Sequence, residues 1–409
     1  MKIFLRSRKG SYIVFITLVF SSVLIMTTAV LHAAGQRAID STVQHFGRLW
    51  GRSILAEYDR TLKERYGFFG FYGNEFEVEK KLDFYASYTF DEKKYIRYKD
   101  SVCSLKGKAI TEPDNFKKQI KEIAASGVNP RPIRKNSQEA AASAGDRSIN
   151  SQRITAGLPS EGRRGGGPGI KGLIDLMKEG KPVSALVSQS AQNIYAFRFF
   201  SHRFSDKDFG DSFFRCELEY IISGKTDEGK AKKSVGNDLI LLRNGMNLIY
   251  LYSCDEKRGA AAAAAQAATP GPAAVVTQAL IMETWALLEA QNDLKILEDN
   301  KPVRFMKYDE NWAVSLENVI SVLFDDESGD GESPGYIRPE SMDGMEYEEY
   351  LRILLSAVPE ETRILRMMDI IQINMKYLYC GSFLLKDYYT GLEFSFGVNG
   401  RTYEFKEDY

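Results

Sequence analysis

Few residues of this chain have the types and spacing that catalysis or metal binding requires. The 409 residues include 3 His and 4 Cys, and no CxxC or HxxxH spacing occurs among them. Zinc and haem sites need such ligands close together. A nucleophile–His pairing cannot be singled out with so few histidines. We therefore predict a protein that is not an enzyme and that has no metal site, no cofactor and no identified small-molecule substrate.

Two segments contain part of a ligand-binding motif. The glycine-rich segment 162–172 contains Lys171, but Gly172 follows it where a P-loop needs Ser or Thr. The acidic segment 326–331 is similar to the start of a calcium loop, but Ile337 occupies the position of the bidentate acid. We interpret the first segment as a flexible loop and the second as an exposed acidic loop.

The four cysteines leave their disulfide state open. Disulfides form in proteins outside the cell, but the irregular spacing gives no basis for pairing. Cys216 and His202 lie among apolar residues and are expected to be structural side chains. The four cysteines are Cys103, Cys216, Cys254 and Cys380.

The charge balance argues against a nucleic-acid-binding surface. Lys and Arg number 54 and Asp and Glu number 55, which gives a formal net charge of −1. Proteins that bind nucleic acid or an anionic membrane over a wide surface are normally basic. Hydrophobic residues make up 44% and aromatic residues 12% of the chain, so a folded core is expected. The length is enough for two or three domains.

The N-terminal residues predict a single membrane span. A basic leader (1–10) precedes residues 11–34, which contain no charged side chain. As a helix these 24 residues would span about 36 Å, against about 30 Å of hydrocarbon. The cations of the leader predict a cytoplasmic N-terminus and an extracellular C-terminal domain at the cell membrane. Two alternatives stay open: a cleaved signal peptide, because small residues stand at 33–35, and a buried helix of a soluble protein.

An amphipathic pattern continues beyond the apolar segment. From residue 36 to residue 66, apolar side chains recur at spacings of three and four, with no Pro between them. The pattern predicts that the membrane helix continues outward as one rod. Its apolar stripe must be covered, either by the protein's own globular part or by another subunit, which would make it an assembly face. The stripe consists of Ile39, Val43, Phe46, Trp50 and Ile54.

The leader and the apolar run resemble the N-termini of pilin-like and TadE/TadG-like proteins of tight-adherence (Tad) pilus systems. The leader ends at Gly10, and Ser11 opens the apolar run. The resemblance implies that Gly10 is a processing site and that the protein partners belong to a Tad-like assembly. Type IV pilins carry Glu at the fifth position after the cleavage glycine, where this chain has Phe15. An anchored accessory protein therefore fits the resemblance better than a polymerising pilin.

Further along, the chain contains SILAEYDRTLKERYGFFGFYGNE (53–75), GLPSEG (157–162), RCELEYIISGK (215–225), the Ala-rich stretch 259–279, YEEYLRILL (347–355) and RMMDIIQINMK (366–376). These segments resemble an uncharacterised family of Firmicutes single-span membrane proteins that are often associated with Tad-like pilus machinery. The resemblance implies a setting in the cell envelope but no chemistry.

Composition divides the outer part of the chain into three regions. Residues 35–126 are expected to form a helical stalk and a small α/β unit, and residues 171–409 the main extracytoplasmic α+β domain. Residues 127–170 contain no aromatic side chain and are rich in Gly, Pro and Ser. This composition predicts a flexible linker or loop.

Local patterns predict an α+β fold in which helices are the majority. Helices are expected at 76–88, after a cap at Thr111, and at 184–204, 227–252, 255–268, 275–297, 346–357 and 359–379. Strands are expected at 95–105 and at 213–223. In the second strand Cys216 would lie on the buried face, and Glu217 and Glu219 on the exposed face. Asn399-Gly400, between 388–398 and 401–406, predicts a C-terminal β-hairpin.

Two functional hypotheses follow from these patterns and resemblances. The leading one is a non-enzymatic, membrane-anchored envelope protein, an accessory or minor pilin-like component of a Tad-like pilus or secretion assembly. The alternative is an anchored surface module for adhesion or carbohydrate binding that acts independently of a pilus. Neither the ligand nor the oligomeric state can be predicted from the sequence.

Overall fold

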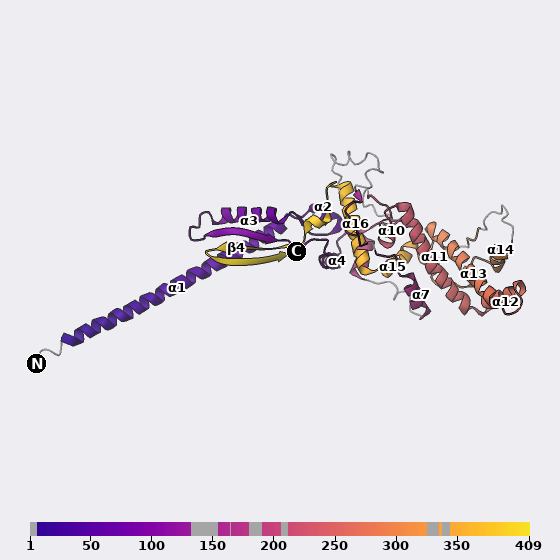
Figure 1. Cartoon of the computed structure of the whole chain (residues 1–409), viewed down its shortest axis with the longest axis horizontal. Coiled ribbons are helices and arrows are strands. Elements are labelled where there is room, and N and C mark those ends of the chain that lie inside the picture. The colour runs from indigo at the N-terminus through magenta and orange to yellow at the C-terminus, as the bar shows by residue number, and fades with distance from the viewer. Residues whose placement is uncertain are drawn as a thin grey trace. The chain divides into compact units, whose positions relative to one another are not determined.

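The computed structural model describes residues 6–131, 154–163, 165–179, 190–205, 212–324, 335–337 and 344–409. These residues form two compact units (Figure 1). Unit 1 consists of Met1–Asp59, Phe69–Ala109 and Asp387–Tyr409, and unit 2 of Arg60–Phe68 and Ile110–Lys386. The C-terminal hairpin therefore belongs with the N-terminal helix and not, as predicted, with the domain 171–409.

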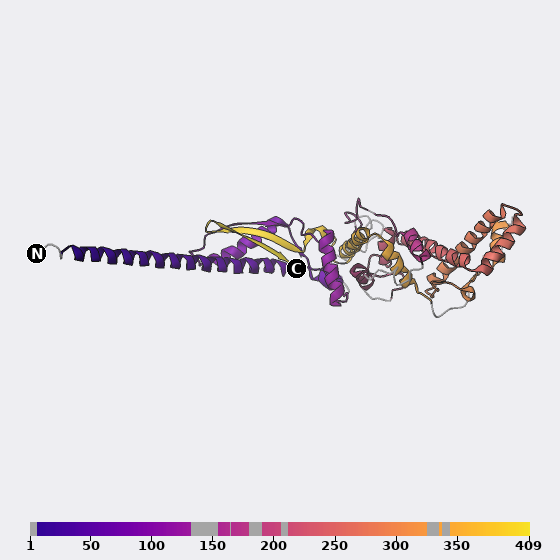
Figure 2. The same cartoon turned by 90° about the horizontal axis from the view of Figure 1, so that it is seen from below.

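The first helix, α1 (Arg6–Leu55), is continuous over 50 residues. It contains no Pro, and its apolar part lies outside any core of the protein. Figure 2 shows this part projecting beyond the strands of unit 1 as a straight helix. By length and composition α1 is the one candidate membrane span among the described residues, and the predicted rod is confirmed.

Unit 1 places a small antiparallel sheet against the second half of α1. The sheet has the order β2 (Tyr98–Ser104), β4 (Gly391–Val398), β5 (Arg401–Asp408), and β1 (Phe71–Tyr72) pairs separately with β3 (Tyr388–Tyr389). Helix α3 (Glu75–Phe90) packs on β2. Asn399 and Gly400 both have positive φ, 53° and 82°, as a two-residue hairpin turn requires. The predicted helix 76–88, strand 95–105 and C-terminal hairpin are thus confirmed.

Among the described residues of unit 2, the regular secondary structure is helical, and one isolated β-bridge joins Val303 to Met345. Helices α11 and α13 pack most extensively against each other, and almost every residue of α16 is buried. The helices are α2 (Arg60–Tyr66), α4 (Pro113–Ser126), α7 (Ile170–Lys178), α9 (Ala191–Phe199), α10 (Glu217–Ser223), α11 (Glu228–Ser253), α12 (Asp255–Ala268), α13 (Ala274–Glu298), α14 (Leu316–Phe324), α15 (Tyr347–Ala357) and α16 (Glu360–Leu378), with 3₁₀ turns η1 (Asp309–Asn311) and η2 (Leu385–Asp387).

The strand predicted at 213–223 is wrong, because residues 217–223 form helix α10. The prediction assumed that Glu217 and Glu219 face solvent, but both are fully buried. Glu217 Oε2 accepts the backbone N–H of Ser201 at 2.8 Å, and Glu219 Oε1 accepts that of Arg203 at 3.1 Å. Carboxylates satisfied inside a core produced the same alternation in sequence as a half-exposed strand.

Two predicted helix starts differ from the observed ones. Helix α4 begins at Pro113 with Glu112 as its N-cap and no side-chain cap, so the cap expected from Thr111 is wrong. Helix α9 begins after Ser190, whose hydroxyl accepts the N–H of Asn193. The first six residues of the helix predicted at 184–204 lie outside the described residues, and the helix ends at Phe199.

The described part of the predicted linker 127–170 is not free chain. Residues 154–163 and 165–170 lie against α16, whose buried polar side chains bind their backbone. Asp369 Oδ1 accepts the N–H of Ser160 at 2.9 Å, and Gln372 Nε2 donates to the carbonyl of Gly157 at 2.8 Å. A segment without aromatic residues is thus held by hydrogen bonds. The predicted acidic loop 326–331 lies outside the described residues.

Candidate functional site: an apolar groove in unit 2

The residues predicted as a candidate assembly face lie in the core of unit 1. Val43, Trp50 and Ile54 are buried, and Ile39 and Phe46 pack at the edge of the same cluster. The Trp50 ring lies 5.1 Å from that of Phe396 on β4 and 5.3 Å from that of Phe90 on α3. The stripe is therefore covered by the protein's own sheet, and its interpretation as an assembly face is wrong. Gly10 lies within α1.

Gly47 lets α1 pass close to the sheet. A Cβ atom at this position would lie 2.1 Å from Cζ of Phe405. Only a residue without a side chain lets β5 pass this close to the helix. The glycine that weakens helix propensity at this point is therefore a packing residue.

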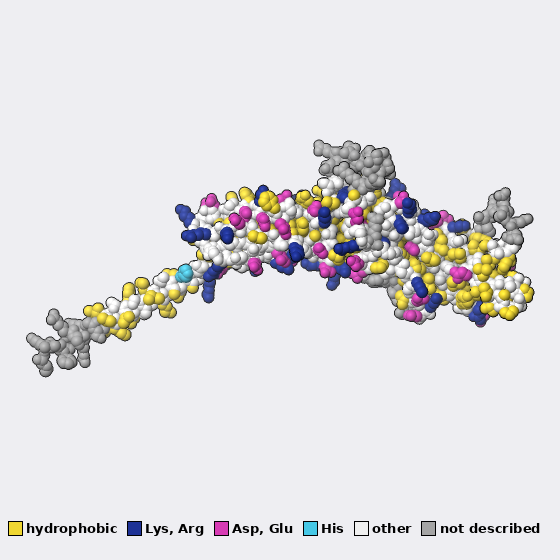
Figure 3. Space-filling model, viewed as in Figure 1, with side chains coloured by type: hydrophobic (Ala, Val, Ile, Leu, Met, Phe, Trp, Pro, Cys, Tyr) yellow, Lys and Arg dark blue, Asp and Glu magenta, His cyan; other side chains and the backbone are white. Residues whose placement is uncertain are grey.

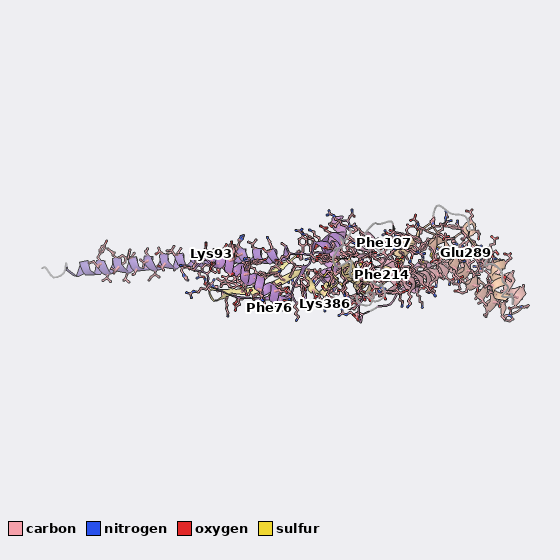
Figure 4. All side chains as sticks on the ribbon, turned by 90° about the horizontal axis from the view of Figure 1, so that it is seen from above. Phe76, Lys93, Phe197, Phe214, Glu289 and Lys386 are labelled. Atoms are coloured by element: carbon pink, nitrogen blue, oxygen red, sulfur yellow. The ribbon has the colours of Figure 1, made fainter. Side chains whose placement is uncertain are left out.

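Unit 2 contains a buried network of charged side chains at the α11–α13 contact. Arg243 Nη2 lies 2.8 Å from Asp293 Oδ2, and Lys307 Nζ lies 2.5 Å from Asp293 Oδ1. Lys307 also pairs with Glu289, labelled in Figure 4. Burial opposes the charge on Arg243, but the Asp293 carboxylate beside it raises the pKa of the guanidinium. Two cations and two carboxylates thus neutralise one another inside the core.

This network is built for structure. Glu289 accepts the backbone N–H groups of Ala313 and Val314 at 3.1 and 2.8 Å, and Arg243 donates to the carbonyl of Phe305 at 2.6 Å. Both carboxylates are fully buried, so no substrate can reach them. The network fixes the segment between α13 and α14 onto α11 and leaves the outer face of α11 unused.

The outer face of α11 forms one wall of an apolar groove of about 790 Å³, with α7 as the other wall. Ile174 of α7 lies against Gly245 of α11, where a Cβ would come within 2.5 Å of the Ile174 side chain. The groove is lined by Ile170, Lys171, Ile174, Asp175, Lys178, Leu241, Asn244, Gly245, Leu248, Ile249, Tyr252 and Ser253. Its volume falls in the range of ligand-binding clefts.

The lips of the groove combine exposed apolar and basic side chains. Leu241 is 55% and Tyr252 51% exposed, although both are large apolar residues. Lys178 pairs with Asp175 at 3.7 Å, and Lys171 has no ionic partner among the described residues. Figure 3 shows hydrophobic side chains gathered over the α11, α12 and α13 part of unit 2. An apolar trough whose edge carries Lys171, unpaired as far as the described residues go, suits an amphipathic helix with an acidic flank.

Sequence reasoning missed this groove, although a signal for it was present. Residues 239–252 (LILLRNGMNLIYLY) are apolar on nearly every side of α11. A helix that is apolar all round must be covered on more than one side. The pattern showed that a second face exists, but not that α7 would cover only part of it.

Metal and disulfide chemistry find no support in the described residues. No group of three or more His, Cys, Asp or Glu is placed to hold a metal ion in the described part of the chain. Cys103 and Cys216 are buried and Cys254 and Cys380 are partly exposed, and all four are free thiols. The core position predicted for Cys216 is confirmed, and burial raises the pKa of its thiol.

The fold and these features define a helix-rich α+β protein with one long apolar N-terminal helix and an apolar groove between two outer helices. Within this class, the chain belongs to a family of unknown function (DUF5702), which matches residues 107–400. No curated protein and no solved structure matches the chain.

Proposed function

We propose that the chain is a single-span, membrane-anchored envelope protein without enzymatic activity, an accessory or minor pilin-like component of a Tad-like pilus or secretion assembly. One observation carries the proposal: half of α1 is apolar and uncovered, while the other half is built into the core of unit 1. A helix of this kind is covered when its free half lies in a bilayer. The basic leader and the resemblance of the N-terminus to TadE/TadG-like proteins support the assembly setting.

The groove supplies the contact that such a component needs. An assembly protein must hold a partner, and the predicted stripe on α1 is already occupied by the sheet. The groove between α7 and α11 offers apolar walls and a basic lip instead. In this proposal it receives an amphipathic helix of another assembly component, with the acidic flank of that helix facing Lys171.

Co-purification of the full chain from membranes tests the proposal. The double variant Leu241→Glu/Tyr252→Glu places charges on the two exposed lips, so it should fold and insert normally. Under the proposal, wild type co-purifies with other components of a Tad-like assembly, and the groove variant should lose them. The matched control is Val275→Glu/Val276→Glu, which changes two exposed apolar side chains on α13 outside the groove.

Two results would contradict the proposal. If wild type co-purifies with no assembly component, the setting is wrong. If the groove variant keeps its partners as well as the control does, the groove is not the contact.

A second candidate function is an anchored surface module that binds carbohydrate. Phe76, Phe84 and Tyr88 are exposed on one side of α3, and the Lys80 ammonium lies 4.2 Å from the centre of the Phe76 ring. Aromatic faces open to solvent suit amphipathic ligands. Titration of wall glycan fragments against wild type and Phe84→Ser/Tyr88→Ser would detect this activity.

A further inference from the structure

We propose that the end of unit 1 nearest the apolar half of α1 binds the headgroups of anionic phospholipids. We call this end the membrane-proximal rim. The inference rests on the proposed function, because it requires α1 to span a membrane. The rim consists of Arg37, Lys93, Lys94, Tyr95, Arg97 and Arg401.

The contacts of unit 1 place the rim at the level of Asp40 on α1. Arg401 Nη1 lies 3.2 Å from Asp40 Oδ2, and the Tyr403 hydroxyl donates to the same carboxylate. Further along, Phe405 contacts Gly47 and Glu407 lies 3.7 Å from Arg52. Strand β5 therefore runs in the same direction as α1, and the turn that precedes it faces the apolar half.

The loop between α3 and β2 is tied to that turn. The Arg97 N–H donates to Asn399 Oδ1 at 2.9 Å, and Asn399 Nδ2 donates to the carbonyl of Tyr95 at 3.0 Å. Lys93 donates to the carbonyl of Thr89 at 2.8 Å, and Figure 4 shows it where the apolar half of α1 leaves unit 1. Loop, turn and helix thus form one edge of fixed geometry.

The distance along α1 brings this edge to the membrane surface. Asp40 follows the end of the apolar segment at residue 34 by about 9 Å of helix. The headgroup layer on each side of a bilayer is about 5–7 Å thick. The turn lies still closer to the apolar half than Asp40, and Lys and Arg side chains bridge the remaining gap.

The charge of the rim fits phosphate. Five cations, four exposed and Lys93 half-buried, stand against three acids, Asp40, Asp91 and Glu92, which leaves a net of +2. Asp40 is already bound by Arg401 and Tyr403, whereas Arg37, Lys94 and Arg97 are exposed and have no ionic partner within the described residues. Tyr88 and Tyr95, 85% and 60% exposed, add the aromatic side chains that lie at membrane interfaces. Juxtamembrane cations of this kind attract anionic lipid surfaces.

Fluorescence quenching in reconstituted vesicles tests the inference on the full chain. The native Trp50, Trp285 and Trp312 are buried, so Tyr95→Trp introduces an exposed reporter at the rim. We expect nitroxide-labelled headgroups to quench the introduced indole in vesicles of phosphatidylcholine with about 30% phosphatidylglycerol. Quenching should be much weaker in pure phosphatidylcholine and should fall as salt rises.

Charge removal gives the matched comparison. Adding Lys94→Ser/Arg97→Ser should lower the ratio of lipid-bound to free rim about fivefold for each cation removed. The control Lys80→Gln/Lys106→Gln removes two exposed cations of unit 1 outside the rim and should leave quenching unchanged.

The outcomes separate the rim from the anchor. Equal quenching in neutral and anionic vesicles, no quenching in either, or quenching that survives Lys94→Ser/Arg97→Ser would each overturn the inference while the anchor stands. If the full chain leaves the vesicles in an alkaline carbonate wash, α1 does not span the bilayer, and the proposed function falls together with the rim.

Discussion

The cores of the two units are stabilised by different kinds of interaction. The core of unit 1 is an aromatic and aliphatic cluster in which Trp50, Phe394, Phe396 and Phe405 stack between helix and sheet. Among the described residues of unit 1, Lys108 is the one buried charged side chain. Unit 2 instead buries carboxylates and cations on α10, α11, α13 and α16.

This difference in core chemistry determines which substitutions each unit tolerates. An apolar core tolerates exchange of similar side chains, because dispersion and burial are not directional. A core with charges tolerates little, because every buried charge needs its partner. We therefore expect unit 1 to respond to changes of shape and unit 2 to changes of charge.

The largest effect is expected from Asp293→Ala in unit 2. The substitution leaves Arg243 and Lys307 buried without their shared carboxylate. Breaking such a pair costs about 3–5 kcal/mol of unfolding free energy. Denaturant unfolding followed by Trp285 and Trp312 fluorescence, with Trp50 replaced by Phe, reports on unit 2. Asp255→Ala, which breaks an exposed pair with Arg258, should cost less than about 1 kcal/mol and serves as the control. Equal losses of unfolding free energy in Asp293→Ala and Asp255→Ala would show that the buried charges of unit 2 are no more important for stability than exposed ones.

The next effect is a pH dependence of opposite sign in the two units. Burial raises the pKa of Asp238, on α11, from 3.8 to about 6. The folded state then binds the proton more tightly, so the unfolding free energy of unit 2 falls as pH rises from about 4 to about 6. Asp238→Asn removes this loss, so the variant should be more stable than wild type in unit 2 at pH 7, with no gain at pH 4.

The corresponding carboxylate of unit 1 behaves in the reverse way. Burial opposes the charge of Asp83, but hydrogen bonds from Ser101 and Tyr98 outweigh it and lower the pKa below 3.8. Ionised Asp83 therefore stabilises unit 1 at pH values above the pKa of Asp in the unfolded chain. This stabilisation is lost as the pH falls through the lower pKa that Asp83 has in the folded state. Acid titration of Trp50 fluorescence should show the loss in wild type and not in Asp83→Asn. The same direction of change in both units would contradict the assignment.

The smallest effect is one of shape, in unit 1. Gly47→Ala improves helix propensity by about 1 kcal/mol but drives a methyl group into the Phe405 ring. Overpacking costs about 1–3 kcal/mol, so unit 1 should lose about 1 kcal/mol in net stability. Gly35→Ala, in the same helix with nothing within 4 Å of the new Cβ, should not destabilise unit 1. A neutral Gly47→Ala would show that β5 can move away.

Elements with strong local signals were predictable. The helices 228–253, 255–268 and 274–298 followed from periodicity and the Pro-Gly-Pro break, and the hairpin from Asn399-Gly400. Helix α10 was missed because a buried Glu cannot be told from an exposed one by sequence alone. The pairing of α1 with β5 was missed for another reason: contacts between distant segments leave no local pattern.

The candidate site was less predictable than the fold. The stripe on α1 correctly identified a face that needs cover, but not the strand that covers it. The groove depends on Gly245, whose missing side chain admits Ile174, and no periodicity indicates which helix will use such a gap. Local patterns therefore locate faces that need a partner, while the partners themselves follow from tertiary packing.

The distance in sequence between α1 and its cover has a consequence for biogenesis. Tyr403 and Asp40, which meet in unit 1, are 363 positions apart. A ribosome that adds about 5–20 residues per second needs on the order of 20 to 70 s to make the intervening chain. Throughout that time the stripe of Val43, Trp50 and Ile54 has emerged without the strand that shields it. The nascent protein therefore depends on a temporary cover for α1, from a chaperone or the membrane itself, until its last strand arrives.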